Sequence, residues 1–307
     1  LRDDPETSTI VGYMEGFDDG RRLLEVVRQT SLEKPVVVLR GGTSELGKRA
    51  AASHTGALAS STAVFDAAAR QSGLLVTTDP DEFMDLTFAL SYMPLPPGKR
   101  VAVATLGGGW GVLVSDEIAR AGLTLADLDE DVIEKLNAIL PPYWSHSNPI
   151  DLVSSTAPGV PEAVLEVLVA SDKVDAVIVM GVVGAMSESR RALREIDQLK
   201  AAQEAAIAAG AAADTAVEGQ CGDEAEVAEP ELSEREMQFI QQVAGLMDRY
   251  CKPIANISLK PMTQAVFSLG GRYSTFVLPS PLRAVRILGK MAEHGAYLRR
   301  HGRDLNC

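Results

Sequence analysis

The chain has 307 residues, of which 46% are hydrophobic and 23% charged, and its formal net charge is −13. This ordinary composition, with no run of 18 apolar residues and no basic-then-apolar opening, predicts a globular protein without a membrane span or secretory signal. The acidic balance argues against nucleic-acid binding, which needs a basic surface. Three cysteines far apart form no CxxC pair, so we expect no disulfide framework or zinc site, and a cytoplasmic protein.

The first third of the chain alternates buried strands with helices. Strands are predicted at 7–14, 34–39 and 74–78, and helices at 19–30 and 61–71. A further helix has a strong start signal, with Asp79 at the N-cap, Pro80 at the first helical position and Glu82 at the third. Only three strands are few for a doubly wound sheet, so we expect this first domain to be incomplete at its N-terminus, where Leu1 stands in place of Met.

The break at 94–100, rich in proline, separates this series from a second one. Its helices are marked by the glycine run at 107–111, by the capping box Ser233-x-x-Glu236 and by Ser280-Pro281. The first of them is expected to carry Trp110, Leu113, Val114, Ile118 and Ala121 on one side. Apolar strands of this series are predicted at 101–106, 149–153, 174–183, 253–259 and 274–278.

Apolar strands that alternate with amphipathic helices predict parallel sheets covered on both faces. We therefore expect an α/β protein with two doubly wound domains, at 1–95 and 98–307. The stretch at about 204–232 is rich in Ala and Glu and lacks aromatic residues, which is typical of an acidic surface insertion. Eight acidic residues and no Lys or Arg fall between 209 and 234, so most of the net charge is local.

Two glycine-rich loops follow predicted strands. The turn Gly107-Gly108-Gly109-Trp110-Gly111 opens a helix, so its free N–H groups would form an anion site suited to phosphate. The dinucleotide fingerprint would need glycine where Val112 stands, and no Lys-Ser/Thr of a P-loop is present. Glycines that only permit a tight strand-to-helix turn are the competing interpretation.

The second loop, at 39–59, holds His54 in a turn of small residues at the carboxyl edge of a parallel sheet, where α/β folds bind ligands. His54 can be a nucleophile, a base, a metal ligand or a structural hydrogen-bonding group. Metal binding is disfavoured because no second His, Cys or acidic cluster lies near it in sequence, so no metal site is predicted. His146, His294 and His301 fall in polar segments that we expect to be exposed, and no role is assigned to them.

Glu15 follows the first predicted strand, beside the loop of the next strand. A carboxylate there can orient an imidazole and stabilise its charge, although an exposed loop acid is equally consistent with the sequence.

The sequence resembles the NDP-forming acyl-CoA synthetases, which include ADP-forming acetyl-CoA synthetase and, more distantly, succinyl-CoA synthetase. The resemblance covers nearly the whole chain in one order and is most specific at Ser-His-Thr-Gly-Ala. It is carried by the segments 3–21 with Tyr-x-Glu-Gly, 34–59 with the histidine, 65–86, 98–123, 148–152 and 252–259.

This resemblance implies two flavodoxin-like ligase subdomains and a reaction through an acyl phosphate. His54 would take the phosphoryl group as a phosphohistidine and pass it to ADP, while Glu15 would hydrogen-bond the other ring nitrogen. CoA and ATP or ADP with Mg are the implied cofactors. The residues implied in phosphate binding are Thr55, Gly56, Gly107, Gly108, Gly109, Trp110 and Gly111.

Two departures from the family's pattern stand out. Trp110 replaces a smaller residue of the usual glycine turn, and no CoA-binding Rossmann domain or ATP-grasp domain is found in this sequence. We expect these domains on missing sequence or another chain, an oligomer, and acyl-CoA and phosphate as small-molecule partners. A non-catalytic relative that binds CoA or acyl-CoA is the alternative favoured by Trp110. A flavodoxin-like or dinucleotide-binding protein shares only the fold class.

Overall fold

The computed structural model describes residues 1–17, 19–55, 62–153, 155, 157–184, 200, 232–258, 265–268 and 270–305. Nearly all of the predicted acidic insertion at 204–232 lies outside these residues.

A small parallel sheet is formed by the strands of the first third of the chain. It contains β1 (Ile10–Met14), β2 (Val36–Arg40) and β3 (Leu75–Thr77) in that order. Each predicted strand is confirmed, with ends shifted by up to three residues. The strands are parallel because a helical segment returns the chain to the same edge after each one.

Helices pack against both faces of the small sheet. Val36 and Val38 of β2 lie in one core cluster with side chains of α1 (Gly20–Ser31) and α3 (Thr62–Ser72). Val37 points to the other face and packs with α4 (Pro80–Tyr92). This alternation is the period of two that a β-strand imposes on its side chains. Asp19 caps α1 and Asp79 caps α4, as the sequence predicts.

A larger sheet, seven-stranded among the described residues, is built from the rest of the chain, with β9 as its one antiparallel strand there. Its order is β5-β4-β7-β8-β10-β9, with β6 pairing the carboxyl end of β4. The strands are β4 (Arg100–Thr105), β5 (Thr124–Leu125), β6 (Ile150–Asp151), β7 (Ala176–Met180), β8 (Ile254–Ile257), β9 (Ala265–Phe267) and β10 (Thr275–Leu278).

Helices also cover both faces of the large sheet. One face packs against α7 (Val160–Ala170) and α9 (Glu234–Tyr250), with α6 (Glu130–Ile139) beside α7. The other face packs against α5 (Gly108–Arg120) and α10 (Pro281–Arg300). The expectation of an α/β fold with doubly wound parallel sheets is thus confirmed, and so is the capping box Ser233–Glu236 at the start of α9.

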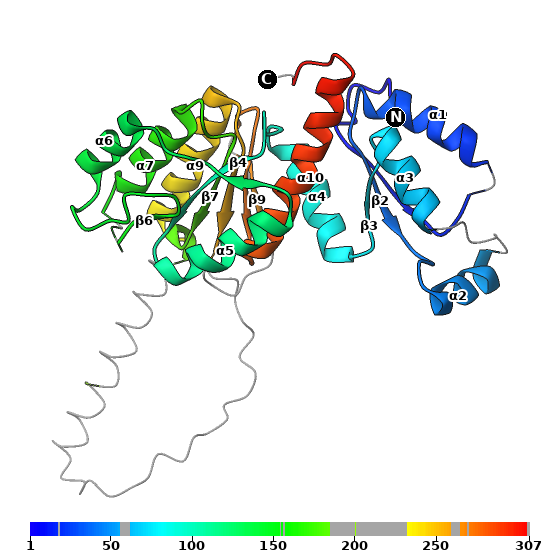
Figure 1. The fold of residues 1–307 in the computed structure, drawn as a ribbon, viewed down its shortest axis with the longest axis horizontal. Coiled ribbons are helices and arrows are strands. Elements are labelled where there is room, and N and C mark those ends of the chain that lie inside the picture. Colours follow the sequence, from blue (N-terminus) through cyan, green and yellow to red (C-terminus); the bar gives the residue numbers. More distant parts are fainter. Residues whose placement is uncertain are drawn as a thin grey trace, which may run out of the picture.

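Two helices lie between the sheets and join them (Figure 1). Helix α4 contacts β2 and β3 of the small sheet and β10 of the large one, and α10 runs against α4 and the large sheet. Leu86 of α4 is fully buried in a cluster that holds Val37 of the small sheet and Phe276 of the large one. One continuous core therefore spans both predicted domains, whose boundaries at 95 and 98 remain a proposal.

Three sequence expectations outside the site are wrong in detail. His294 is buried in α10, because the polar residues around it face outward while its own position faces the small sheet. Cys251 is disulfide-bonded, because a tertiary fold can join cysteines that sequence spacing leaves unconnected. Trp110 and Leu113 are about half exposed, because the buried face of α5 is centred on Gly111, Val114 and Ile118. Among the described helices, none combines the length and the apolar character that crossing a bilayer requires.

Candidate functional site

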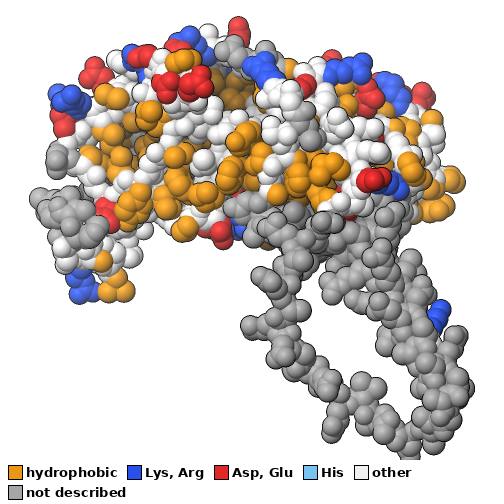
Figure 2. Space-filling view, turned by 180° about the vertical axis from the view of Figure 1, so that it is seen from behind, with side chains coloured by type: hydrophobic (Ala, Val, Ile, Leu, Met, Phe, Trp, Pro, Cys, Tyr) orange, Lys and Arg blue, Asp and Glu red, His pale blue; other side chains and the backbone are white. Residues whose placement is uncertain are grey.

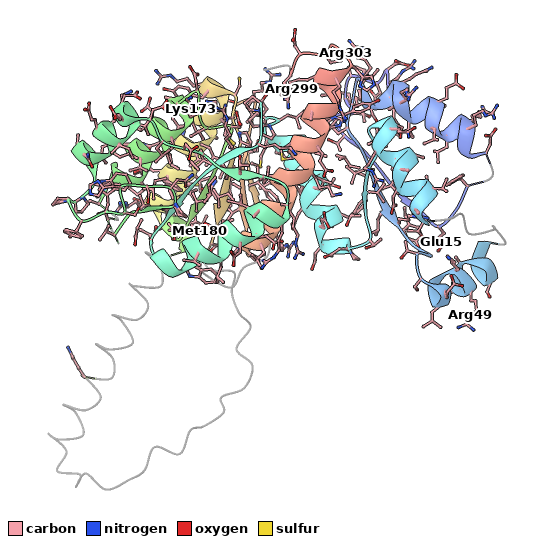
Figure 3. All side chains as sticks on the ribbon, viewed as in Figure 1. Glu15, Arg49, Lys173, Met180, Arg299 and Arg303 are labelled. Atoms are coloured by element: carbon pink, nitrogen blue, oxygen red, sulfur yellow. The ribbon has the colours of Figure 1, made fainter. Side chains whose placement is uncertain are left out.

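The predicted site residues lie at the carboxyl edges of the two sheets. Glu15 directly follows β1, the Gly41–Gly42 turn follows β2, and the glycine turn at 107–111 follows β4. Figure 3 places Glu15, Arg49 of α2 and Met180 of β7 at the same end of the molecule. This is the edge where open parallel sheets leave room for ligands.

Glu15 is held by its neighbour two residues earlier. The hydroxyl of Tyr13 donates a hydrogen bond of 2.8 Å to the Oε1 atom of Glu15, and this bond raises the pKa of Tyr13. The loop leaves no space for a side chain at Gly41, where a Cβ atom would lie 2.5 Å from the Tyr13 hydroxyl. Gly41 thus lets the chain that follows β2 pass close to the Tyr13–Glu15 pair.

His54 lies in a helix, which corrects the expectation of a tight turn. Helix α2 (Glu45–Thr55) begins after Ser44, whose hydroxyl accepts the amide N–H of Gly47 at 3.1 Å. This cap and the alanines at 50–52 favour helix over the turn that the flanking glycines suggest. Gly42 supplies the bend before α2 with a φ of +66°, which glycine adopts without strain.

The start of α2 and the Glu15 loop converge at Gly42. A Cβ atom at Gly42 would lie 3.5 Å from the Cβ of Ala51 and 3.6 Å from the carbonyl oxygen of Glu15. His54 follows Ala51 by three positions in the same helix. The side chains of His54 and Thr55, and all of Gly56, lie outside the described residues. The predicted hydrogen bond between His54 and Glu15 therefore stays a prediction.

The glycine turn after β4 forms an open helix start. Helix α5 has Gly107 at its N-cap without a side-chain cap, and within the described chain the amides of Gly108 and Gly109 have no hydrogen-bond acceptor. Thr105 fixes the turn, because its Oγ1 bonds both the carbonyl and the amide of Gly107, at 3.0 and 3.2 Å. Free amides at the positive end of a helix dipole suit an anion.

Asp151 lies at this helix start, and our sequence reasoning did not single it out. It ends β6, and its Oδ2 lies 3.3 Å from the position a Cβ would take on Gly108. Its other oxygen accepts the amide of Val153 at 2.8 Å. The carboxylate therefore stands at the N-terminus of α5, where its negative charge stabilises the helix and would oppose a phosphoryl group bound beside it. The sequence feature that could have pointed to Asp151 is its position at the end of Asn-Pro-Ile-Asp, a short strand segment after a loop.

Asn148 holds the segment that carries Asp151. Its Oδ1 accepts the amide of Val103 at 2.9 Å, and its Nδ2 donates to the carbonyls of Val101 and Ala126. Pro149, joined to Asn148 by a cis peptide bond, packs against Gly111, where a Cβ would lie 3.0 Å from the proline Cβ. This packing explains why a glycine stands in the first turn of α5.

In the described backbone, α2 and the start of α5 do not lie next to each other. In Figure 1, α2 projects from the end of the small sheet, and α5 lies on the other side of α4. Trp110 is 44% exposed on the outer side of α5. No group of three or more His, Cys, Asp or Glu side chains suited to a metal ion occurs among the described residues.

Comparisons with known proteins match the two halves of the chain to two domain models. Residues 1–90 match the succinyl-CoA ligase like flavodoxin domain, and residues 101–228 match the ligase-CoA domain. The ADP-forming acetate–CoA ligase II subunit alpha of Pyrococcus furiosus is 48% identical over 155 residues, which are 50% of this chain and 34% of that protein. The corresponding subunit alpha of ligase I from the same organism is 45% identical over 152 residues, which are 50% of this chain and 33% of that protein.

A solved structure resembles nearly all of this chain. The dinucleotide forming acetyl-coenzyme A synthetase 1 of Ca. Korarchaeum cryptofilum, in complex with phosphate and ADP, superposes with a TM-score of 0.68 and 25% identity over 98% of this chain. The match covers 56% of that protein, and the chain spans about a third of the length of the Pyrococcus subunits. From the matched domains, the Pyrococcus relatives and this fold, the chain belongs to the family of ADP-forming acyl-CoA synthetases.

Proposed function

We propose that this chain is part of an acid–thiol ligase that interconverts acyl-CoA, ADP and phosphate with a carboxylic acid, CoA and ATP. The proposal is supported by the names of the relatives, which are ADP-forming acetate–CoA ligases. The observation that carries it within this chain is the convergence of Glu15, the Gly42 bend and the helix of His54 at one sheet edge.

The proposed reaction has three steps. A phosphate oxygen attacks the thioester carbon, the C–S bond breaks, and CoA leaves as a thiol. A nitrogen of the neutral His54 imidazole then attacks phosphorus of the acyl phosphate, and the carboxylate leaves. A β-phosphate oxygen of ADP attacks the same phosphorus, and the N–P bond breaks to give ATP and free His54. Neutral imidazole is suited to this task because it is nucleophilic near pH 7.

Residues at the sheet edges have distinct proposed roles. Glu15 is a positioning residue that accepts the N–H of the second ring nitrogen and favours the positive charge that the ring gains on phosphorylation. Thr55 and Gly56 are proposed to contact the phosphoryl group. The open amides of Gly108 and Gly109, with the flanking Gly107, Trp110 and Gly111, are proposed to bind inorganic phosphate or the acyl phosphate at the start of α5, because α5 does not lie beside α2 and its His54 in this structure.

The domains that bind CoA and nucleotide with Mg are proposed to lie outside this sequence, fused to it or on a partner chain. The projection of α2 from the body of the molecule supports this arrangement, because a domain outside the chain could reach the helix of His54 (Figure 1). The same reasoning makes an oligomer or a larger fused chain the proposed active form.

A labelling experiment tests the phosphohistidine. The complete enzyme is incubated with ATP that carries a radioactive γ-phosphate, and the protein is assayed for an acid-labile, base-stable label. We expect label on the wild type and on S53A, a matched control because Ser53 is exposed and, among the described residues, its hydroxyl donates to the carbonyl of Arg49 in its own helix. His54→Ala is expected to carry none.

The Glu15 role has its own readout. E15Q keeps the shape of the side chain but loses its negative charge, so the pKa of the His54 ring should fall. In a plot of labelling rate against pH, the decrease on the acid side should then move to lower pH. An unlabelled wild type, or full labelling of the His54→Ala variant, would reject the phosphohistidine. An unlabelled enzyme that still binds CoA in calorimetry would support the alternative, a non-catalytic regulatory relative.

A further inference from the structure

A cavity of about 840 Å³ lies at the interface between the small sheet and α10. It opens at the amino ends of β3 and β4, since Gly73 to Leu75 and Lys99 contribute to its wall. Cations, aromatic rings and apolar groups line it, together with one amide and one acid. The lining residues are Ala67, Arg70, Gln71, Gly73, Leu74, Leu75, Lys99, Glu293, His294, Ala296, Tyr297, Arg300 and His301.

The cavity carries an excess of positive charge in an acidic protein. Arg70, Lys99 and Arg300 lie on its wall with exposed side chains, and none of the three has an ion-pair partner within the described part of the chain. Its one acid, Glu293, lies 3.8 Å from Lys290 on the same helix, so it is partly neutralised from outside the cavity. Three cations from α3, the start of β4 and the end of α10 thus surround one opening.

The floor of the cavity holds a buried imidazole with unused hydrogen-bonding capacity. His294 is 2% exposed, and its Nδ1 is fully buried without a partner. Burial lowers its pKa to about 4, so the ring is neutral at pH 7 and offers one donor and one acceptor. Neither ring nitrogen bonds another described residue. The Nδ1 atom has no surface that a ligand could contact, whereas the Nε2 atom is not among the fully buried unpartnered atoms, so Nε2 is the ring nitrogen open to a partner from the cavity.

The walls around His294 are fixed by close packing. Gly73 has a φ of +76°, and a Cβ on it would lie 2.4 Å from the ring of Tyr297. The hydroxyl of Tyr297 donates to the carbonyl of Arg28 at 3.4 Å, which joins α10 to α1. The cavity is therefore preformed between elements of both sheets, as small-molecule sites usually are.

This cavity lies at the opposite end of the molecule from the candidate site. Figure 3 shows Arg299, next to Arg300, at one end and Glu15 and Met180 at the other. The view from behind in Figure 2 shows charged side chains gathered along that same upper edge, with apolar side chains across the middle of the face. A ligand here would not touch the carboxyl edges where the ligase chemistry is proposed.

We propose that the cavity between α3, β4 and α10 is a second anion site, which binds a phosphate-bearing small molecule of nucleotide size. Its volume falls in the range of about 300–1,000 Å³ that such ligands occupy. The guanidinium groups of Arg70 and Arg300 match phosphate oxygens in geometry as well as charge, and Lys99 adds a third positive charge. The imidazole of His294 would hydrogen-bond the part of the ligand that reaches the floor.

Such a ligand would bridge the two sheets, because its contacts come from α3 and β3 on one side and from α10 on the other. Binding would therefore stabilise the joint between the sheets and raise the melting temperature of the chain. This site does not depend on the phosphohistidine, so a failure of one proposal leaves the other in place.

Calorimetric titration of the purified chain at pH 7 tests the proposal. The probes are ADP, CoA and inorganic phosphate, each titrated separately, so that the three results distinguish a nucleotide, a CoA moiety and the phosphate group alone. We expect saturable binding of at least one probe. The double variant R70Q/R300Q should weaken it about tenfold or more, since each guanidinium makes a charge-assisted bond.

Arg299→Gln is the matched control, because Arg299 is the exposed neighbour of Arg300 on α10 and does not line the cavity. It should bind within about twofold of the wild type. His294→Leu, which removes the floor hydrogen bond but no charge at pH 7, should weaken binding, and in the wild type the bound ligand should shift the His294 ring resonances in NMR. Absence of saturable binding for all three probes, or equal affinity in R70Q/R300Q and the wild type, would overturn the proposal.

Discussion

At the scale of single residues, Gly73 shows how one position joins the two parts of the fold. It adopts a φ of +76° at the turn before β3, and the ring of Tyr297 from α10 lies directly over its Cα. Any side chain would need a backbone conformation that L-residues disfavour and would also displace the ring. Glycine is thus required both for conformation and for contact.

The first prediction concerns this position. Gly73→Ala should lower the free energy of unfolding by about 3 kcal/mol, the sum of left-handed strain and overpacking. Gly122→Ala is the control, because Gly122 has a φ of +68° but no atom within 4 Å of an added Cβ, and should cost only about 1 kcal/mol. Urea unfolding of both variants measures the difference, and equal losses would show that the Tyr297 contact contributes nothing.

The second prediction concerns the pH dependence of stability. Burial lowers the pKa of His294 from 6.5 to about 4, so the folded state disfavours its protonation. The unfolded chain takes up this proton first as pH falls from 6.5 towards 4, and stability is lost across that window by about 3 kcal/mol. Below pH 4 both states are protonated and the contribution is constant. The charged groups near the ring in its cavity are Arg70, Lys99, Glu293 and Arg300.

Unfolding of the wild type and of His294→Leu at pH 7 and pH 4.5 measures this contribution. The wild type should lose more stability between the two pH values than the variant. The difference is the contribution of His294 to the pH dependence of the free energy of unfolding. If both proteins lose the same amount, the acid sensitivity arises from other groups.

At the scale of elements, an ion pair fixes the crossing of α4 and α10. The carboxylate of Asp85 is fully buried in α4 and accepts two hydrogen bonds from the guanidinium of Arg283 in α10, at 2.5 and 2.7 Å. Burial raises the pKa of Asp85, and the guanidinium lowers it only in part. The pair sets the register of the two helices that lie between the sheets.

Asp85→Ala should therefore lower the free energy of unfolding by about 3 kcal/mol, because it removes the buried carboxylate that accepts two hydrogen bonds from the guanidinium of Arg283. Asp81 is the matched control: it lies one turn earlier on α4, 4.0 Å from the same guanidinium, and is 75% exposed. Asp81→Ala should change stability by less than about 0.5 kcal/mol. Thermal unfolding followed by circular dichroism gives both values. A similar loss of unfolding free energy in the two variants would mean that the Asp85–Arg283 pair does not hold α4 against α10.

At the scale of the whole molecule, the continuous core predicts that the two sheets unfold together. Leu86→Ala removes a fully buried side chain that packs between them and should cost about 2–5 kcal/mol. Hydrogen exchange should then lose protection at amides of both β2 and β7 by a similar factor. Val64→Ala, on the exposed side of α3, is the control with little expected effect. Loss of protection confined to β2 would show two independently folding units.

Much of the fold could be predicted because its elements are encoded locally. The side chains of Asp79, Ser233 and Glu236 each accept a backbone amide N–H within three residues of themselves, so the sequence shows these helix starts without the rest of the chain. The family segment around His54 and the position of Glu15 after a strand were likewise visible in sequence. The helix at 45–55 was not, because flanking glycines masked the cap at Ser44.

The sequence by itself determined the α/β class, most of the strands and helices and the identity of the candidate phosphoryl carrier, because each depends on short-range periodicity or on a contiguous motif. Only the tertiary structure decided that α4 and α10 lie between the sheets, that Asp151 stands beside Gly108, and that His294 is buried in a cationic cavity. These features join residues far apart in the chain. Their energies come from long-range packing and desolvation, which leave no periodic or contiguous pattern in the sequence.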